Sequence, residues 1–246
     1  MSTDYRYTFS GIIYPERAEI NLPTIPIRMN AVDAGISGTV IVTSSSSQLS
    51  AIFESSSEVN DVFTLKNYVA DVVRVIVDGY GYLSGCGYDV EIVKLVLTGG
   101  PEPIMFGVDI PVLRPSGTDI SVPFTQLMRV FADERSLYVQ RSLGDFREAI
   151  RSPKDTAFFC YRALESLRQY FVVEEHIPSD KTSWERLRQA LAVERATIDY
   201  VKTFADPLRH GAGKSISDSE RADLFIKTKS IIDRFIVFAD NQYKDA

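Results

Sequence analysis

The amino-acid sequence predicts an α+β protein, with a β-rich N-terminal domain that contains one long helix and a C-terminal antiparallel α-helical bundle. Two observations support this division. Residues 1–118 alternate apolar and polar side chains or form short β-branched runs bounded by glycine and proline. From about Phe124 onward, apolar residues recur at helical spacing instead. A turn-rich stretch at residues 114–117 opens the linker, so we expect one domain over residues 1–118 and a second over residues 127–246.

Four segments of the first domain are predicted to be strands: residues 5–10, 20–27, 38–43 and 88–97. The second of these contains Pro23 and Pro26. It therefore suits a sheet edge or an irregular extension, because proline has no backbone N–H to donate to a neighbouring strand. The serines at residues 44–47 indicate a loop or bulge.

One segment of the first domain has a helical pattern. Its apolar residues at helical spacing are Leu65, Val69, Val72, Val73, Ile76 and Tyr80. Gly79 and Gly81 are expected to end this helix. We therefore expect one long helix packed on the sheet.

The second half contains five predicted helices with short connections, which is typical of an antiparallel bundle. The first covers residues 134–150, and Ser152 with Pro153 reads as the N-cap and first position of the second. That second helix directs apolar residues toward a core, namely Phe158, Tyr161, Leu164, Leu167 and Phe171. Two capping boxes precede later helices, Thr182 with Glu185 and Ser217 with Glu220. Between these two lies a helix over residues 194–208.

Composition limits the classes of protein. The 246 residues are 45% hydrophobic, enough for a substantial core, and no apolar run is long enough to cross a bilayer. The N-terminus has no secretory pattern, and Cys86 and Cys160 are read as free thiols, so we expect a cytoplasmic protein without membrane contact. Residues 1–126 carry 7 Lys/Arg against 14 Asp/Glu, whereas residues 127–246 carry 20 against 19. This acidity disfavours broad nucleic-acid binding, and no motif indicates a metal or cofactor.

The segment LRHGAGKSIS can be read as a phosphate-binding loop or as part of a polar site. A phosphate loop that ends at Gly213 and Lys214 needs a glycine at position 208, which is Leu208. The segment also follows a helical pattern, whereas a phosphate loop follows a strand. Gly211 and Gly213 are better explained as the stop signal of that helix.

The left half of the same segment contains Arg209 and His210. Asp206 lies four residues before His210, hence on the same helical face, where it could hold the imidazole. With Arg209 as a fixed positive charge, the three residues could cleave RNA without metal: the histidine would transfer protons and the arginine would stabilise the phosphorane. In the alternative interpretation, His210 only caps the helix C-terminus, where the dipole favours it.

A second polar group lies on the predicted helix CYRALESLRQYF. Arg162, Glu165 and Gln169 share one face, which could turn toward Arg209 and His210 as a supporting cluster. The alternative is a solvent-facing ion pair between Arg162 and Glu165. The other histidine, His176, is predicted to be an exposed loop residue.

The second half resembles the HEPN superfamily of helical domains. The resemblance rests on the helix CYRALESLRQYF, the downstream helix that ends in DPLRHG, and the long closing helix. Many proteins of this superfamily are dimeric, metal-independent ribonucleases of defence and toxin–antitoxin systems, and others are inactive and only bind or dimerise. The resemblance therefore implies a homodimer, RNA as a candidate partner, His210 as the catalytic histidine and Arg209 as the candidate arginine.

The spacing of these two residues differs from that of the active members, which place the arginine several residues before the histidine. Here positions 204–206 are Phe, Ala and Asp, and Arg209 is adjacent to His210. We therefore favour a catalytically silent interaction and dimerisation module in defence or stress response, with a metal-independent ribonuclease as the alternative. For the N-terminal half we expect a sensing role or a protein partner.

Overall fold

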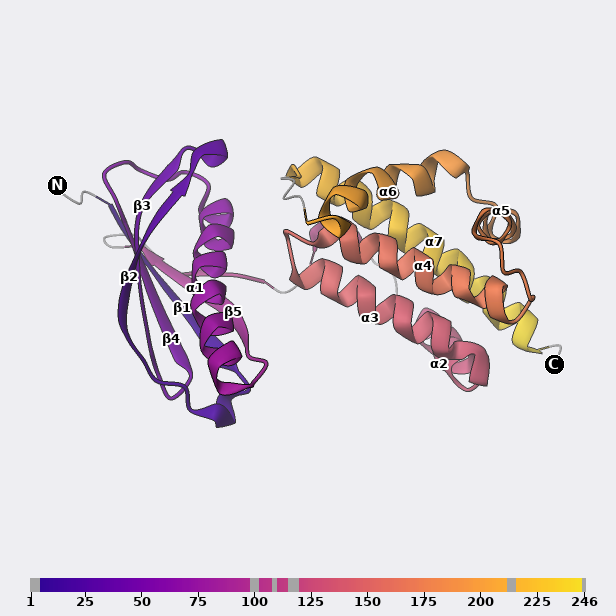
Figure 1. Ribbon diagram of the computed structural model, residues 1–246, viewed down its shortest axis with the longest axis horizontal. Helices are drawn as coiled ribbons and strands as arrows, with labels where there is room; N and C mark the ends of the chain where they lie inside the picture. Colours follow the sequence, from indigo (N-terminus) through magenta and orange to yellow (C-terminus); the bar gives the residue numbers. More distant parts are fainter. Residues whose placement is uncertain (1–4, 98–101, 108–109, 115–119, 212–215, 245–246) are drawn as a thin grey trace. The chain divides into compact units, whose positions relative to one another are not determined.

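A computed structural model of the chain describes residues 5–97, 102–107, 110–114, 120–211 and 216–244. The chain forms two compact units, residues 1–108 and 109–246, each with its own hydrophobic core (Figure 1). The first contains an antiparallel sheet and the second contains helices, so the predicted α+β class is confirmed. No helix in the described parts of the chain has the length and apolar character needed to cross a membrane.

The first unit contains a six-stranded sheet with the order β2-β3-β4-β1-β5-β6 and antiparallel pairing throughout. The strands are β1 (Tyr5–Tyr14), β2 (Leu22–Ala31), β3 (Ile36–Ser45), β4 (Gln48–Ser55), β5 (Asp89–Leu97) and β6 (Ile104–Met105). Strand β2, with Pro23 and Pro26, lies at the sheet edge as predicted. Strand β4 was not predicted. It follows a tight turn at Ser46 and Ser47, both with positive φ, inside the segment predicted to be a loop or bulge.

Helix α1 (Val62–Ser84) covers one face of this sheet (Figure 1). Its buried residues pack against the inward-facing residues of the strands, among them Phe9, Val40 and Phe53. The predicted end at Gly79 and Gly81 was wrong by about a turn. The helix continues to Ser84 and ends at Gly85, whose φ of 68° is the left-handed conformation typical of a helix C-terminus.

The second unit contains six α-helices in its described residues, one more than predicted. They are α2 (Ser121–Phe131), α3 (Leu137–Arg151), α4 (Thr156–Val173), α5 (Asp180–Leu191), α6 (Arg195–Arg209) and α7 (Asp218–Lys244). Helix α2 is the unpredicted one, and the guanidinium of Arg129 fixes it to the Asp240 carboxylate of α7 at 2.9 Å. Ile110 and Leu113, which precede it, pack against the core of this unit.

Two helix starts differ from the prediction. Helix α4 begins at Thr156, whereas Ser152, predicted to be its N-cap, ends α3 and donates a hydrogen bond to the Asp155 carboxylate. Helix α5 begins at Asp180, where the Ser179 hydroxyl accepts a hydrogen bond from the Thr182 N–H. The capping box before α7 is confirmed by reciprocal hydrogen bonds between Ser217 and Glu220.

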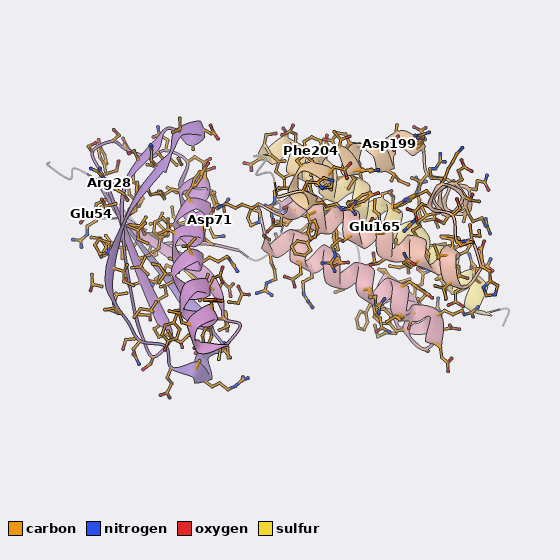
Figure 2. The ribbon with its side chains drawn as sticks, viewed as in Figure 1. Arg28, Glu54, Asp71, Glu165, Asp199 and Phe204 are labelled. Carbon is orange, nitrogen blue, oxygen red and sulfur yellow. The ribbon has the colours of Figure 1, made fainter. Side chains whose placement is uncertain are left out.

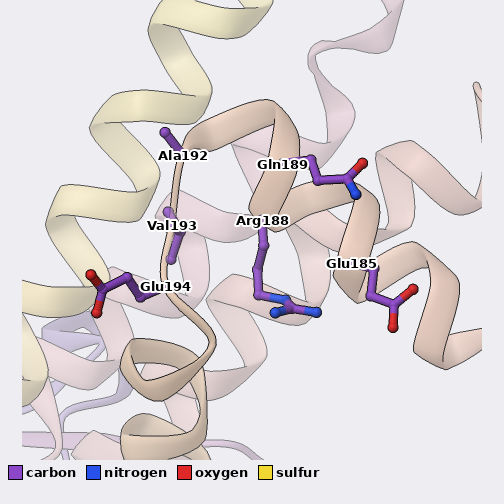
Figure 3. Close-up of a pocket in the computed structure, with 6 residues that line it drawn as sticks. All are labelled: Glu185, Arg188, Gln189, Ala192, Val193 and Glu194. Carbon is purple, nitrogen blue, oxygen red and sulfur yellow. The ribbon is translucent and has the colours of Figure 1, made fainter.

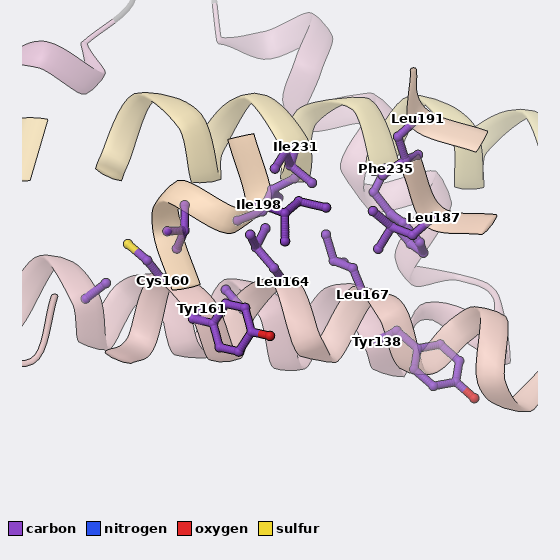
Figure 4. Close-up of a cluster of buried hydrophobic side chains, with 14 of the residues drawn as sticks. Tyr138, Cys160, Tyr161, Leu164, Leu167, Leu187, Leu191, Ile198, Ile231 and Phe235 are labelled. Atoms are coloured by element: carbon purple, nitrogen blue, oxygen red, sulfur yellow. The ribbon is translucent and has the colours of Figure 1, made fainter. Parts of the chain in front are cut away.

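Helix α4 is the centre of the bundle and packs against α3, α5, α6 and α7. Four of its five predicted core residues are buried, and Phe158 is half-buried. Figure 4 shows Tyr161, Leu164 and Leu167 of α4 in a cluster with Ile231 and Phe235 of α7. This arrangement leaves the opposite face of α4 free to carry the polar residues of the candidate site.

Candidate functional site

Arg209 is the last residue of α6, and its side chain contacts the polar face of α4. Its guanidinium lies 3.7 Å from the Glu165 carboxylate and 3.7 Å from the Asp206 carboxylate. It also lies over the ring of Tyr161, 5.4 Å from the ring centre. Figure 2 labels Glu165 on α4 and Phe204 on α6, the helix that carries Arg209. The structure therefore brings together three residues of the predicted site, Arg209, Glu165 and Asp206.

The contact of Arg209 with Tyr161 is the first layer of a stack that crosses three helices. The Tyr161 ring stacks on the indole of Trp184 in α5, with ring centres 5.9 Å apart and an interplanar angle of 24°. Arg168 of α4 covers the other end, 5.4 Å from the indole centre. We call Arg209, Tyr161, Trp184 and Arg168 the cation–aromatic ladder. A guanidinium lies over each end of the stack. Because its four members come from α4, α5 and α6, the ladder connects these three helices.

The Arg168 end of the ladder is buried and anchored. Its guanidinium pairs with the Asp180 carboxylate at the start of α5 and lies 3.4 Å from the Ser183 hydroxyl. The hydrogen bond from Arg168 lowers the pKa of Asp180. The Nε of Arg168 is buried and has no hydrogen-bond partner among the residues that the structure describes. The ladder thus contains a guanidinium that is fixed by packing as much as by hydrogen bonds.

Burial dominates the electrostatics of Glu165. It raises the pKa of this carboxyl above its usual range, and nearby guanidinium groups, of which Arg209 has the largest effect, oppose the increase. Burial also raises the pKa of the Tyr161 phenol to about 12, with a further contribution from Glu165. Arg209 is therefore the main counter-charge of a half-buried carboxylate.

The other predicted members of the polar cluster lie apart from Arg209. Arg162 pairs with the Asp145 carboxylate of α3 at 3.1 Å, so the predicted ion pair between Arg162 and Glu165 is replaced by a contact between helices. Asp145 also accepts a hydrogen bond from Ser166, and its burial raises its pKa. Gln169 is half-buried, and its amide makes no hydrogen bond to the described residues. The polar stripe therefore divides, with Glu165 contacting α6 and Arg162 contacting α3.

His210 follows α6 directly and is exposed to solvent. Its backbone N–H bonds to the carbonyls of Asp206 and Pro207, at 3.3 and 3.2 Å. Within the described part of the chain its imidazole has no hydrogen-bond or ion-pair partner, and the Asp206 carboxylate, predicted to hold it, pairs with Arg209 instead. Gly211 has a φ of 77°, which confirms the predicted glycine stop, whereas Gly213 and Lys214 lie outside the described residues.

A shallow surface hollow of about 340 Å³ lies at the junction of α5 and α6. It is lined by Glu185, Arg188, Gln189, Ala192, Val193 and Glu194 (Figure 3), none of which belongs to the predicted site. Among the residues that the structure describes, no three His, Cys, Asp or Glu side chains converge as a metal site.

Two family models match the chain. The N-terminal domain of DUF8168, a domain of unknown function, matches residues 7–106, and its C-terminal domain matches residues 124–240. The chain belongs to the DUF8168 family. No curated protein and no solved structure matches it. The two matched ranges follow the structural division of this DUF8168 protein between Val108 and Asp109.

Sequence reasoning did not single out two charged residues of this DUF8168 site, Arg168 and Asp145. A signal for Arg168 is present, because it lies one helical turn after Leu164 and two turns after Tyr161, on the apolar face of α4. A cation on that face indicates a buried, partnered side chain. No comparable signal exists for Asp145, whose contact with Arg162 depends on how α3 packs against α4.

Proposed function

We propose that the C-terminal unit of this DUF8168 protein is a HEPN-like interaction and dimerisation module without catalytic activity, acting in a defence or stress response. One observation carries the proposal: the Arg209 guanidinium lies beside the carboxylates of Glu165 and Asp206 and over the Tyr161 ring. In this role, Arg209 stabilises the packing of α6 on α4, and His210 is a solvated residue at a helix end.

The charge around Arg209 supports this assignment. Glu165 and Asp206 carry two negative charges against the one positive charge of Arg209, so the group is net negative when all three are ionised. An arginine that stabilises a phosphorane acts on a dianionic centre and must present its free N–H groups to it. A phosphate at Arg209 would meet two carboxylates that already lie 3.7 Å from its Nη1 atom.

The surroundings of His210 support it as well. A catalytic histidine usually has a partner on one ring nitrogen that sets the tautomer and orients the ring. The described residues supply no such partner for His210, since Asp206 contacts Arg209. Arg209 is the last residue of α6, whereas His210 lies outside the helix, with φ −99° and ψ 13°.

A metal-independent ribonuclease is the second candidate, and one observation favours it. The His210 side chain is exposed at the end of α6, where a substrate could reach it. Among the described residues, no cationic side chain contacts the His210 ring. In a homodimer, a second copy of the chain could supply this positive charge. This alternative therefore requires both an assembled dimer and a histidine-dependent activity.

The two candidates differ in the cleavage of a mixed RNA pool in the presence of a metal chelator. We expect neither the wild type nor His210→Ala to cleave the RNA. We also expect light scattering during size-exclusion chromatography to show a dimer. His176→Ala is the matched control, because His176 is the other histidine, is exposed, and lies in a loop. Cleavage by the wild type and His176→Ala that is lost in a folded His210→Ala would refute the silent module and support the ribonuclease.

A further inference from the structure

Helix α1 has an unusual outer face in its C-terminal half. The inner face packs on the sheet through Leu65, Val69, Val73, Val77 and Gly81. On the opposite side, Val75, Tyr82 and Leu83 are 70%, 87% and 84% exposed. Gly79 lies between them, since residues four apart and three apart share a helical face. We call Val75, Gly79, Tyr82 and Leu83 the α1 outer face.

The composition of this face is not that of an ordinary solvated helix. Single exposed apolar residues are common, but four neighbouring positions without a long charged side chain are not. Valine and glycine are also poor helix formers in water. The α1 outer face therefore lacks the residues that would stabilise an isolated surface helix.

Gly79 is not explained by packing within the unit. A Cβ added at Gly79 would meet no heavy atom within 4 Å. At Gly81, in contrast, a Cβ would lie 2.5 Å from the Cys86 carbonyl oxygen, so this glycine is required by the turn that follows. A bare glycine among exposed apolar side chains allows another backbone to approach closely.

The border of the α1 outer face is acidic. Asp78 is exposed beside it, and the nearest cation on the helix, Arg74, is paired with the Asp89 carboxylate of β5 at 3.1 Å. The whole unit has the same sign, because residues 1–108 contain 6 Lys/Arg against 12 Asp/Glu. A ligand that covers the apolar residues would therefore place its margin against negative charge.

We propose that the α1 outer face docks an amphipathic helix of a partner protein, with an apolar ridge flanked by lysine or arginine. The ridge packs between Val75 and Tyr82, the partner backbone approaches at Gly79, and the basic flank lies beside Asp78. Helix-in-groove recognition of this kind combines apolar anchors with charge complementarity. This inference concerns the N-terminal unit and does not depend on the function proposed for the helical unit.

The test uses the full chain and a synthetic amphipathic helical peptide with leucine and alanine on one face and lysine at its margins. Fluorescence anisotropy of the labelled peptide should show saturable binding that weakens at least tenfold when glutamate replaces the lysines. Tyr82→Lys and Gly79→Leu should each weaken binding at least tenfold, the first by removing an anchor and the second by blocking close approach. Val32→Lys is the matched control: it adds the same charge at a position that is 78% exposed and lies outside α1.

Three kinds of outcome would overturn the proposal. The first is equal affinity for the lysine and glutamate peptides, or equal loss of affinity in Tyr82→Lys and Val32→Lys. The second is a dimer of the wild type that Tyr82→Lys dissociates, since the occupant would then be a second copy. The third is protection of Tyr82 from hydroxyl radicals in the monomeric chain, since another part of the chain would then cover the face.

Discussion

Replacement of Arg209 by alanine tests whether the cation–aromatic ladder is structural. The change removes two ion pairs, to Glu165 and Asp206, and the contact with the Tyr161 ring. Because the Arg209 side chain is 38% exposed, each ion pair contributes at most about 1 kcal/mol, and the ring contact about 0.5–1 kcal/mol. We therefore expect Arg209→Ala to lower the free energy of unfolding by about 1–2 kcal/mol.

Urea unfolding followed by tryptophan fluorescence measures this change directly. Trp184 is the single tryptophan of the chain and is itself a member of the ladder, so its emission reports the unfolding of the helical unit. Arg209→Lys should have an intermediate effect, because lysine keeps the charge but lacks the planar group that stacks on Tyr161. His210→Ala is the control and should change the free energy of unfolding by less than about 0.5 kcal/mol.

The pH dependence of the Arg209→Ala effect identifies its cause. Burial already raises the pKa of Glu165, and loss of Arg209 removes the main group that opposes the increase. The ionised Glu165 carboxylate is therefore less favourable in the native state of Arg209→Ala than in the native wild type. The stability that Arg209→Ala loses relative to the wild type is largest above the raised pKa of Glu165, and it shrinks as acid protonates this group. Glu165→Gln should reduce the effect of Arg209→Ala at neutral pH. The reasoning is refuted if Arg209→Ala leaves the free energy of unfolding unchanged at neutral pH, or if His210→Ala lowers it by the same amount.

Three further predictions concern single side chains. In urea unfolding, the wild type should lose stability between pH 10 and about 12, because the native state keeps the Tyr161 phenolic proton, with a pKa of about 12, whereas the unfolded chain releases it. Tyr161→Phe should reduce this loss of stability. An unchanged pH profile would contradict the prediction. Ser217→Ala should lower the free energy of unfolding by about 1 kcal/mol, because it removes the capping box of α7; a loss below about 0.3 kcal/mol would show that the box contributes little. Gly79→Ala should raise the thermal midpoint and increase the free energy of unfolding by about 0.5–1 kcal/mol. Gly81→Ala should lower the thermal midpoint and the free energy of unfolding, because the added Cβ would meet the Cys86 carbonyl oxygen. A more stable Gly81→Ala than Gly79→Ala would contradict the assigned environments.

The fold class could be predicted because it depends on periodicity, which is a local property of the sequence. Period-two alternation identified β1, and helical spacing identified α4, in which four of the five predicted core residues are buried. Strand β4 was missed because its sequence QLSAIFES contains a glutamine, two serines and a glutamate. Its strand character comes from pairing with β1 and β3 on either side, which only the folded sheet supplies.

The candidate site could be predicted only where its contacts stay on one helix or join elements with clear polar faces. Asp206 and Arg209 lie three residues apart on α6, and their contact follows from helical geometry. The partner of Arg162 could not be deduced in this way. Glu165 lies three residues away on the same helix, but Asp145 on α3 is more buried and is the group that Arg162 contacts. The choice between a local and a distant carboxylate depends on helix packing.

The helix ends show the same dependence on the surrounding fold. Gly79, Gly81, Gly85 and Gly211 are chemically identical stop signals, yet only the last two have positive φ and end a helix. Gly81 remains helical because the chain folds back and places a carbonyl against it, and Gly79 remains helical with open space around it. Packing within the chain therefore explains the glycine at position 81 but not the glycine at position 79. The second of these glycines, within an exposed apolar face, indicates contact with a molecule that the isolated chain does not contain, and this difference is the physical basis for assigning a partner to the α1 outer face.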